Sequence, residues 1–500
     1  MMPTFRRTAC LAILYCLTFG VPALRADDTP PAPVVQHGFQ RVTTHEELLA
    51  YLRQVTSPGV AIRIDSIGAT TQGRRIPMAV VLSKGRREEK LRVLIFCSQH
   101  GNEPSGKEAA LMLLERIARG AMKDLLANID LWLIPSMNPD GNELQQRWNG
   151  AGKDLNRDHL IMMQPETRAL HGVYDRILPD ATLDVHEFQT SGKAWEEAGF
   201  YRTMDEQWGA PTNPNVDVWF RRYGVETMFP AIRAGLEADG FRFYNYTIVG
   251  GPADTMRHST TNVNDGRQSL ASQGSYSFIL EGRNGKSFHD DLERRVKGQL
   301  SAITHYLEFL GGHAAVIREK VREARAALPA ARDSVVLLAE YLFSGEAMPM
   351  PVRTTVGGRD SVIRVLHRSM PTPMLRTARP AAYVIPSNQQ DLIDLMRRHD
   401  VTMRTLRRSE RKRVEVQTVH RWNTRIFEED ETLFPEILRT TAERDFAAGD
   451  VIIPLDQRKA ILIMLALEPA SVWGVVQYEP FAGLRVTDAE FPVYRVMNTK

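Results

Sequence analysis

Cysteine is nearly absent from this chain: there are three in 500 residues, Cys10, Cys16 and Cys97. The first two lie in a segment that we expect to be removed, so the mature chain keeps one cysteine and no intramolecular disulfide can form. Cys97 ends an apolar run, and we predict that it is a packed thiol and not a nucleophile. A small fold held together by disulfides is therefore excluded.

An excess of charge of one sign is also missing. Lysine and arginine total 63, aspartate and glutamate total 60, and the formal net charge is +3. Such an even balance offers no general attraction for nucleic acid, so we expect none as a partner. Internal repeats and low-complexity stretches are absent as well. With 43% hydrophobic and 25% charged residues, the composition is that of a soluble globular protein longer than one typical domain.

Long hydrophobic runs are missing except near the N-terminus, where residues 9–20 are apolar apart from Thr18. Arg6 and Arg7 precede this run and small residues follow it, which is the pattern of a secretory signal with its cleavage site. The run is too short to cross a bilayer comfortably. We predict a signal peptide at 1–26, export to the periplasm or out of the cell, and no transmembrane segment after cleavage. A retained membrane anchor is the less favoured alternative.

After a proline-rich linker at 27–40, segments typical of strands alternate with segments typical of helices. This alternation predicts an α/β domain at 41–312, with a mixed, largely parallel central sheet flanked by helices. Ligands of such sheets bind beyond the carboxyl ends of the strands, where the pattern puts His100, Asn138, His186 and Glu281. The predicted strands are 60–68, 76–83, 91–99, 129–137, 181–188 and 275–282, and the predicted helices are 104–119, 165–177, 216–239 and 290–309.

The composition changes near Gly311 and Gly312. A charged helix is predicted at 317–327 and again at 334–341, followed by a region rich in β-type residues and proline with one short helix at 389–399. No set of metal ligands and no nucleophile stands out in this region. We predict a β-containing accessory domain over residues 313–500.

His100 and Glu103 stand three residues apart in FCSQHGNEPSG, directly after a predicted buried strand. Such a pair is weak evidence alone, because 13 histidines produce about one by chance. His305 and Glu308 form another, which we interpret as an ordinary surface pair on a helix. For the first pair the alternative is a capping glutamate beside a loop histidine. Catalytic zinc commonly takes three His or carboxylate ligands, and His186, at the end of another strand, supplies a third.

Six short stretches appear in an order that resembles the zinc carboxypeptidases of the M14 metallopeptidase superfamily. They are HGNEPSG at 100–106, MNPDG at 137–141, Arg147, DLNRD at 154–158, LDVHEF at 183–188 and SYSFILEGR at 275–283. Each stretch is weak alone, but six in the same order are a strong signal. The resemblance covers most of the predicted first domain and none of the residues after 312.

The resemblance implies one Zn²⁺ per chain, bound by His100, Glu103 and His186. Glu281 is implied as the general base and acid, because a carboxylate beside an acidified water takes its proton and later returns it to the leaving amine. Arg147 is implied as the cation that stabilises the developing oxyanion.

Three further residues gain roles from the same resemblance. Asn156 and Arg157 are implied to hold the terminal carboxylate of the substrate, to which a guanidinium binds in bidentate geometry. Asp154 is implied to accept a hydrogen bond from the first zinc-binding histidine. The alternative role for both Arg147 and Arg157 is a surface salt bridge.

The sequence departs from the family pattern at one catalytic position. Members of the pancreatic type have a mobile tyrosine 22 residues before the catalytic glutamate, and here that residue is Ser259. Tyr244, Tyr246 and His258 are candidates to replace it, and the sequence does not choose among them. Arg267 lies near the stretch that lines the family's side-chain pocket, where it would favour an acidic substrate residue. The specificity of known members cannot be transferred to this sequence.

We therefore expect an exported, zinc-dependent metallocarboxypeptidase. It would use a metal-activated water to hydrolyse the C-terminal bond of peptides that have a free terminal carboxylate. The first alternative is a deacylase of the same superfamily, acting on N-acyl amino acids. Others are a hydrolase of murein cell-wall peptides and a catalytically inactive binding protein. The preferred terminal residue and the oligomeric state are left open.

Overall fold

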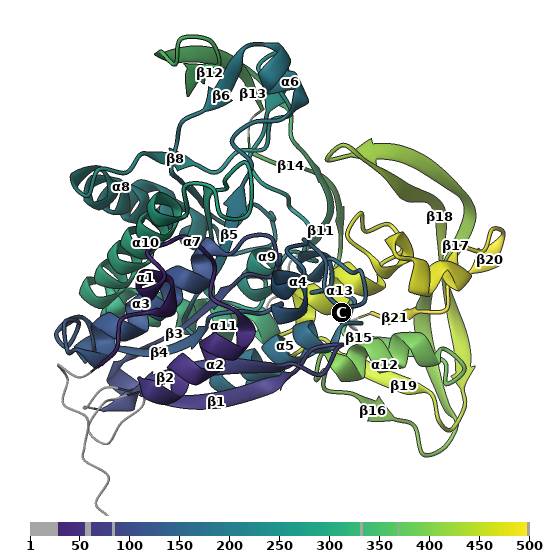
Figure 1. Ribbon diagram of the computed structural model, residues 1–500. Helices are drawn as coiled ribbons and strands as arrows, with labels where there is room; N and C mark the ends of the chain where they lie inside the picture. Colours follow the sequence, from purple (N-terminus) through teal and green to yellow (C-terminus); the bar gives the residue numbers. More distant parts are fainter. Residues whose placement is uncertain (1–28, 56–61, 83–85, 331–333, 369, 498–500) are drawn as a thin grey trace, which may run out of the picture.

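A computed structural model describes residues 29–55, 62–82, 86–330, 334–368 and 370–497 (Figure 1). The predicted signal peptide, with Cys10 and Cys16, lies outside the described residues. Within the described ranges, none of the helices combines the length and the apolar composition that crossing a bilayer requires.

One eight-stranded sheet forms the centre of the first part of the chain, in the order β1-β2-β4-β3-β5-β10-β7-β8. The pairs β4–β3, β3–β5, β5–β10 and β7–β8 are parallel, and the other three are antiparallel. The prediction of a mixed, largely parallel sheet is confirmed. The strands are β1 (Ile62–Ala69), β2 (Arg75–Leu82), β3 (Leu91–Cys97), β4 (Ile129–Ile134), β5 (Ala181–Phe188), β7 (Glu206–Gly209), β8 (Phe243–Asn245) and β10 (Tyr276–Arg283).

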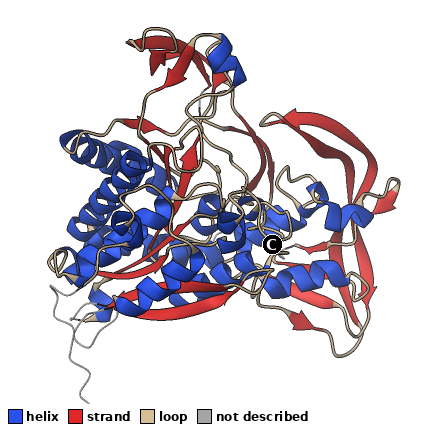
Figure 2. Ribbon diagram, in the orientation of Figure 1, coloured by secondary structure: helices blue, strands red, loops and turns tan. Residues whose placement is uncertain are grey.

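Helices cover both faces of this sheet because its central strands are apolar on both sides (Figure 2). On β3, Val93 and Ile95 face one core, and Leu94 and Phe96 face the other. The first core is closed by α2 (His45–Gln54), α3 (Ser105–Ala118), α8 (Phe229–Ala238), α10 (Leu292–Gly312) and α11 (Ala314–Ala330), and the second by α5 (Pro165–Ile177) and α9 (Gly266–Ala271).

The remaining short helices of this part lie before the first strand or in the connections between strands. The helix predicted at 216–239 is observed as α7 and α8, joined by a π-helical turn at Gly224–Met228. The other short helices are α1 (Pro33–Gln36), α4 (Pro139–Glu143) and α6 (Lys193–Glu197).

A seven-stranded sheet and two helices form most of a second core, at the right of Figure 1, to which Leu160 and Val263 of the first part also contribute. The helix predicted at 389–399 is confirmed as α12 (Gln390–Arg398), and α13 (Ala460–Leu467) is buried throughout. The strands are β15 (Ala382–Ile385), β16 (Arg404–Thr405), β17 (Glu410–Phe427), β18 (Asp430–Phe446), β19 (Val451–Pro454), β20 (Ala489–Glu490) and β21 (Tyr494–Val496).

The helical prediction for 334–341 is wrong. This segment is strand β11 (Val335–Glu340), which pairs antiparallel with β14 (Thr372–Thr377). Its run of Val, Val, Leu, Leu and Ala is buried on both faces of the strand. A short, continuous apolar run carries no periodicity that separates a helix from a buried strand.

A four-stranded sheet joins segments from the two predicted domains. Strands β6 (Phe200–Arg202) and β9 (Thr255–Met256) pair with β12 (Phe343–Thr354) and β13 (Asp360–Arg368), respectively. Helix α11, which begins after residue 312, buries Ile317 and Val321 in the same core as the eight-stranded sheet. The division at residue 312 stays a prediction, and these contacts couple its two sides.

Candidate metal centre and substrate cavity

The segment between β3 and α3 turns sharply and brings His100 and Glu103 together. Ser98 begins the turn with φ of +56°, and its Oγ donates to the carbonyl of Glu103 (3.0 Å). Gly101 lies so close to the backbone of Gly141 in α4 that a Cβ there would overlap it. The strand end, the turn and α4 therefore fix the two side chains.

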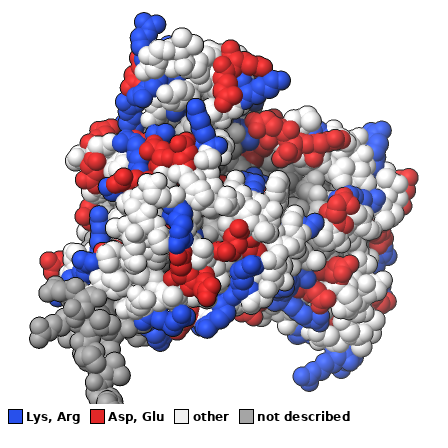
Figure 3. All heavy atoms as spheres, viewed as in Figure 1, with Lys and Arg blue, Asp and Glu red and all other residues white. Residues whose placement is uncertain are grey.

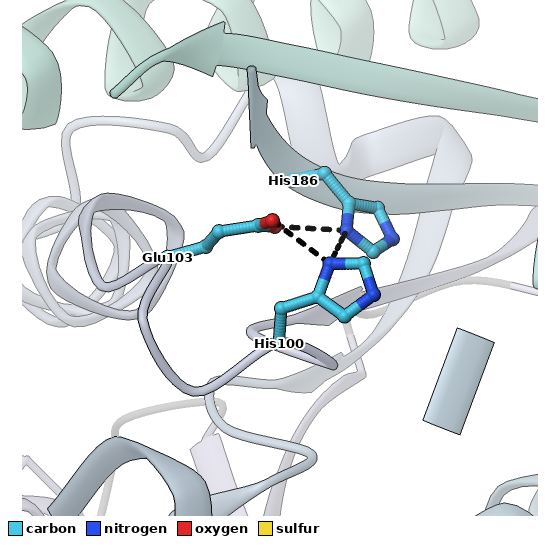
Figure 4. A group of neighbouring side chains, drawn as sticks. All are labelled: His100, Glu103 and His186. Carbon is cyan, nitrogen blue, oxygen red and sulfur yellow. Dashed lines mark hydrogen bonds and ion pairs between the residues drawn. The ribbon is translucent and has the colours of Figure 1, made fainter. Parts of the chain in front are cut away.

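His100, Glu103 and His186 lie within reach of one ion (Figure 4). The Nδ1 atoms of the two histidines are 3.1 Å apart, and each lies close to one oxygen of Glu103, at 2.8 Å for His100 and 2.9 Å for His186. His186 comes from the end of β5, which is next to β3 in the sheet. Two imidazoles and a carboxylate suit zinc.

The outer ring nitrogens decide whether this set fits a metal. His100 Nε2 lies 3.1 Å from Oδ1 of Asp154, and His186 Nε2 lies 2.8 Å from Oδ1 of Asp184. When each Nε2–H donates to its carboxylate, both Nδ1 lone pairs are left pointing at the same place. The residues present therefore fit a zinc ion with one position left for water.

Arg147 lies in the connection that follows α4, and its guanidinium is close to this group. Its Nε and Nη2 both lie 2.9 Å from Oδ2 of Asp154, and its Nη1 is 3.7 Å from Oε1 of Glu103. Burial opposes ionisation of Asp154, but the hydrogen bond from His100 and the charge of Arg147 hold its pKa below the usual range. Asp154 therefore orients the histidine and the guanidinium together.

Asn156 and Arg157 lie in the short helical turn that follows Asp154. Asn156 is buried, and its Oδ1 accepts from the backbone N–H of Gly266 (2.8 Å). Arg157 is exposed to the cavity, and its Nη1 donates to the carbonyl of Asn156 (2.8 Å), which orients the guanidinium. Arg157 therefore presents a guanidinium to the cavity.

Glu281 lies near the end of β10, beside His186 on β5. Burial raises the pKa of the Glu281 carboxyl to about 7, with the charge of His186 opposing the shift, and Tyr246 is hydrogen-bonded to it. A carboxyl that titrates near neutrality is suited to taking and returning a proton. Of the three candidates left open by the sequence, Tyr246 lines the cavity. Tyr244 instead donates to the carbonyl of Pro349 (2.7 Å), and the ring of His258 packs against His367.

One cavity of about 650 Å³ is lined by seven of these residues: His100, Glu103, Arg147, Asn156, Arg157, Tyr246 and Glu281. Of its lining residues, His100, Glu103 and Glu281 are buried, whereas Arg147 is half-buried and Arg157 is exposed. Residues from the C-terminal part complete its walls, although no motif marks them: Phe427, Glu428, Asp430, Glu431, Thr432, Val472, Gln477 and Tyr478.

Sequence reasoning also missed a buried polar chain behind His186. Gln99 donates from Nε2 to both oxygens of Asp184 (2.9 and 2.8 Å), and its Oε1 lies 2.8 Å from Nε2 of His159. Burial lowers the pKa of His159 to about 4, so the ring is neutral and serves as a hydrogen-bond donor. The His159 Nδ1 is in turn 3.1 Å from His171. Gln99 adjoins His100 in the sequence, but no signal there points to His159.

Two other predictions can be checked against the structure. Cys97 is fully buried, and burial raises the pKa of its thiol, so it is packed and protonated. His305 and Glu308 form a half-exposed pair (2.7 Å) on α10. The interpretation of this second His-x-x-Glu pair as an ordinary helix-surface pair is confirmed.

Comparison with known proteins gives three kinds of similarity. The family model for zinc carboxypeptidases matches residues 48–178. Carboxypeptidase 2 of Trichophyton rubrum is 24% identical over 478 residues, which cover 91% of this chain and 86% of that protein. Such coverage takes in most of the residues after 312. Carboxypeptidase SOL1 of Arabidopsis thaliana is 33% identical over 124 residues, 22% of this chain and 25% of its own.

Solved structures give a looser match. A metallo-carboxypeptidase from Pseudomonas aeruginosa in complex with (2-guanidinoethylmercapto)succinic acid aligns with a TM-score of 0.40 and 22% identity. The alignment covers 55% of this chain and 69% of that one. Bovine thrombin-activatable fibrinolysis inhibitor in complex with tick carboxypeptidase inhibitor has a TM-score of 0.43 and 14% identity, and the alignment covers 55% and 99% of the two chains.

Proposed function

Because this chain belongs to the M14 superfamily of zinc carboxypeptidases and is a peptidase hydrolase, we propose that it removes the C-terminal residue of peptides with a free terminal carboxylate. One Zn²⁺ per chain is held by His100, Glu103 and His186. The carrying observation is that His100 and Glu103, which form one potential metal-binding group with His186, line the same cavity as Arg157. A metal-centred hydrolase with a fixed anion receptor at one end is built to act on chain ends.

The bound zinc supplies the Lewis acidity that activates a water molecule and polarises the scissile carbonyl. Asn156 and Arg157 hold the terminal carboxylate through charge-assisted hydrogen bonds, each contributing roughly 1.5–3 kcal/mol. Arg147, oriented by Asp154, faces the carbonyl oxygen as negative charge develops there.

Glu281 moves the proton in this proposal. Its carboxylate accepts a proton from the attacking water and returns it to the leaving amine. The Tyr246 hydroxyl, hydrogen-bonded to Glu281, supplies a second hydrogen-bonding group to the reacting centre. This assigns to Tyr246 the place that Ser259 cannot fill, because a serine side chain is too short to carry a phenol to the same position.

We also propose that the enzyme acts after export, on the strength of the N-terminal segment with Arg6, Arg7 and the apolar run at 9–20. The deacylase alternative is not favoured, since the curated relatives are carboxypeptidases.

The test compares a peptide acid with its amide on the wild-type protein and on Arg157→Ala. The amide lacks the charge that Arg157 pairs with, so its kcat/KM should fall at least about 100-fold, or roughly 2.7 kcal/mol. Arg157→Ala should impair hydrolysis of the acid severely and hydrolysis of the amide much less.

Arg322→Ala is the matched control, because Arg322 is a highly exposed arginine on α11 (76%) away from the cavity. It should keep the wild-type preference for the acid. Equal turnover of the peptide acid and the peptide amide by the wild-type enzyme would refute the exopeptidase proposal.

A further inference from the structure

The turn between β17 and β18 has an unusual composition for its backbone. Glu428 and Glu429 form a two-residue connection with φ of +50° and +75°. Hairpin turns of this kind favour asparagine and glycine, because other residues are strained in the left-handed region. Two glutamates at these positions indicate that their side chains make specific contacts.

Both carboxylates anchor the hairpin to the segment that follows β9. Glu428 accepts hydrogen bonds from the hydroxyl of Thr260 (2.5 Å) and from the hydroxyl (2.6 Å) and backbone N–H (2.8 Å) of Thr261. Glu429 accepts two hydrogen bonds from Arg257, each 2.9 Å long, and Arg257 is only 6% exposed. The tip is therefore held rigidly against a segment that itself lines the substrate cavity.

The next two residues of the hairpin face the cavity instead of the segment that follows β9. Asp430 and Glu431 line the cavity and are exposed. Within the residues that the structure describes, neither has an ion-pair partner. Figure 3 shows acidic side chains gathered at this end of the hairpin, at the margin of a hollow in the surface.

Acidic groups elsewhere in the cavity are already engaged. Glu103 contacts His100 and His186, and Glu281 is hydrogen-bonded to Tyr246. Asp430 and Glu431 are thus two preorganised carboxylates available to a ligand, in the same cavity as Arg147 and Arg157. A ligand that pairs with these arginines and with these carboxylates at the same time carries an anionic group and a cationic group.

We infer that the anchored tip of hairpin β17–β18 is a specificity element of the active site, and that Asp430 and Glu431 bind a cationic group of the peptide. This inference rests on the proposed carboxypeptidase function. The cation comes either from a lysine or arginine side chain near the cleaved bond or from the α-ammonium of a short peptide. Because the tip is fixed before the substrate arrives, binding loses little of its free energy to ordering the carboxylates.

The experiment measures kcat/KM for three tripeptides with the same terminal residue: an acetylated norleucine peptide, its lysine counterpart, and the norleucine peptide with a free amino group. Wild-type enzyme should prefer at least one cationic peptide over the neutral one by about 10-fold, and the preference should shrink at high salt. The arm that carries the preference identifies the source of the cation.

Replacing both carboxylates, as Asp430→Asn/Glu431→Gln, should bring this ratio to about 1. Glu431→Gln alone should lower it partway, which covers the case that the double variant folds poorly. Glu443→Gln is the matched control, because Glu443 lies on the same strand but does not line the cavity. It should keep the wild-type ratio.

A wild-type ratio near 1 in both cationic arms, with all three peptides cleaved, would overturn the inference and leave the carboxypeptidase function standing. If wild-type enzyme cleaves none of the three, the function has failed. Calorimetric Kd values for the same peptides then decide the inference: tighter binding of a cationic peptide, lost in the double variant, supports it, and equal binding refutes it.

Discussion

Each histidine of the metal centre is oriented by a carboxylate that is itself held in place. Asp184 accepts from Gln99, and Gln99 in turn accepts from His159, so the ring of His186 is backed by a chain of hydrogen bonds. Partners of this kind fix which ring nitrogen carries the proton. The site is thereby preorganised at the level of single atoms.

This geometry predicts one zinc per chain and its loss when one ligand is removed. His186→Ala leaves one histidine and one carboxylate, and we expect metal analysis after dialysis to find little zinc in this variant. His305→Ala is the control, because His305 belongs to the other His-x-x-Glu pair, on the surface of α10. It should retain full occupancy. A fully loaded His186→Ala protein would rule this ligand set out.

A second residue-scale prediction concerns Glu206, a buried carboxyl for which the described part of the chain offers neither oxygen a hydrogen-bond partner. Burial raises its pKa well above the usual value, and the charge of Asp205 adds to the shift. The folded state therefore retains a proton that the unfolded chain loses near pH 4.5. Folding stability should fall as the pH rises from there towards the folded-state pKa, by up to about 1.4 kcal/mol per pH unit.

Glu206→Gln removes this titration while keeping the shape of the protonated acid. We expect the variant to be more stable than wild type at pH 8 by about 1–3 kcal/mol, with the advantage disappearing towards pH 5. Thermal unfolding at several pH values measures it. A stability difference that does not change with pH would contradict the assignment.

At the scale of elements, the function depends on how closely the β3–α3 connection packs on α4. The absence of a side chain at Gly101 permits the contact with the backbone of Gly141, and Asn142 Nδ2 donates to the carbonyl of Gly101 (2.9 Å). The neighbouring His100 is carried by the same segment. His100, a proposed metal ligand, is thus positioned by contact between two backbones.

Gly101→Ala should displace this connection, because its Cβ would overlap main-chain atoms that cannot rotate away. We expect destabilisation by about 3 kcal/mol or more and weaker zinc binding, measured by thermal unfolding and chelator competition. Gly172→Ala serves as the control. Gly172 lies within α5 with open space around its Cβ position, so alanine should stabilise that variant by about 0.5–1 kcal/mol.

At the scale of the whole molecule, the two predicted domains are interlocked. The four-stranded sheet takes two strands from each side of residue 312, and the cavity is walled by both sides. A helix is a poor substrate for proteases, and α10 and α11 together fill almost all of 292–330.

Limited proteolysis should therefore cut near residues 331–334, after α11, and the two fragments should remain associated. Denaturing gels would show two bands while size-exclusion chromatography shows one peak of unchanged volume. Fragments that separate without denaturant would show that the strand pairing between the two sides is too weak to hold them.

The alternation of buried strands and amphipathic helices was enough to predict a mixed central sheet and six of its strands, β1 to β5 and β10, but not β7 and β8. Because the parallel strands end at one edge, residues as distant in sequence as His100 and His186 could be expected side by side. Local patterns contain that information, since a strand end and a His-x-x-Glu pair are both visible within ten residues.

Features set by long-range contacts could not be predicted. Nothing in the run at 335–340 separates a strand from a helix until β14 lies beside it. Tyr244 and Tyr246 are equivalent in the sequence, and only the path of the chain after β8 turns the second towards Glu281. The acidic tip at 428–431 has the composition of an ordinary surface turn, and its place in the cavity follows from a hairpin 17 residue pairs long.

The four-stranded sheet also sets an order of events during synthesis. Synthesis of strand β6 is complete at residue 202, but synthesis of its partner β12 begins only at residue 343. At ordinary elongation rates this leaves β6 without its neighbour for roughly 7 to 30 s. Through that interval the nascent chain exposes an unpaired strand edge beside its nearly complete central sheet. Correct closure of the four-stranded sheet therefore requires that this edge stay unpaired until β12 has been made.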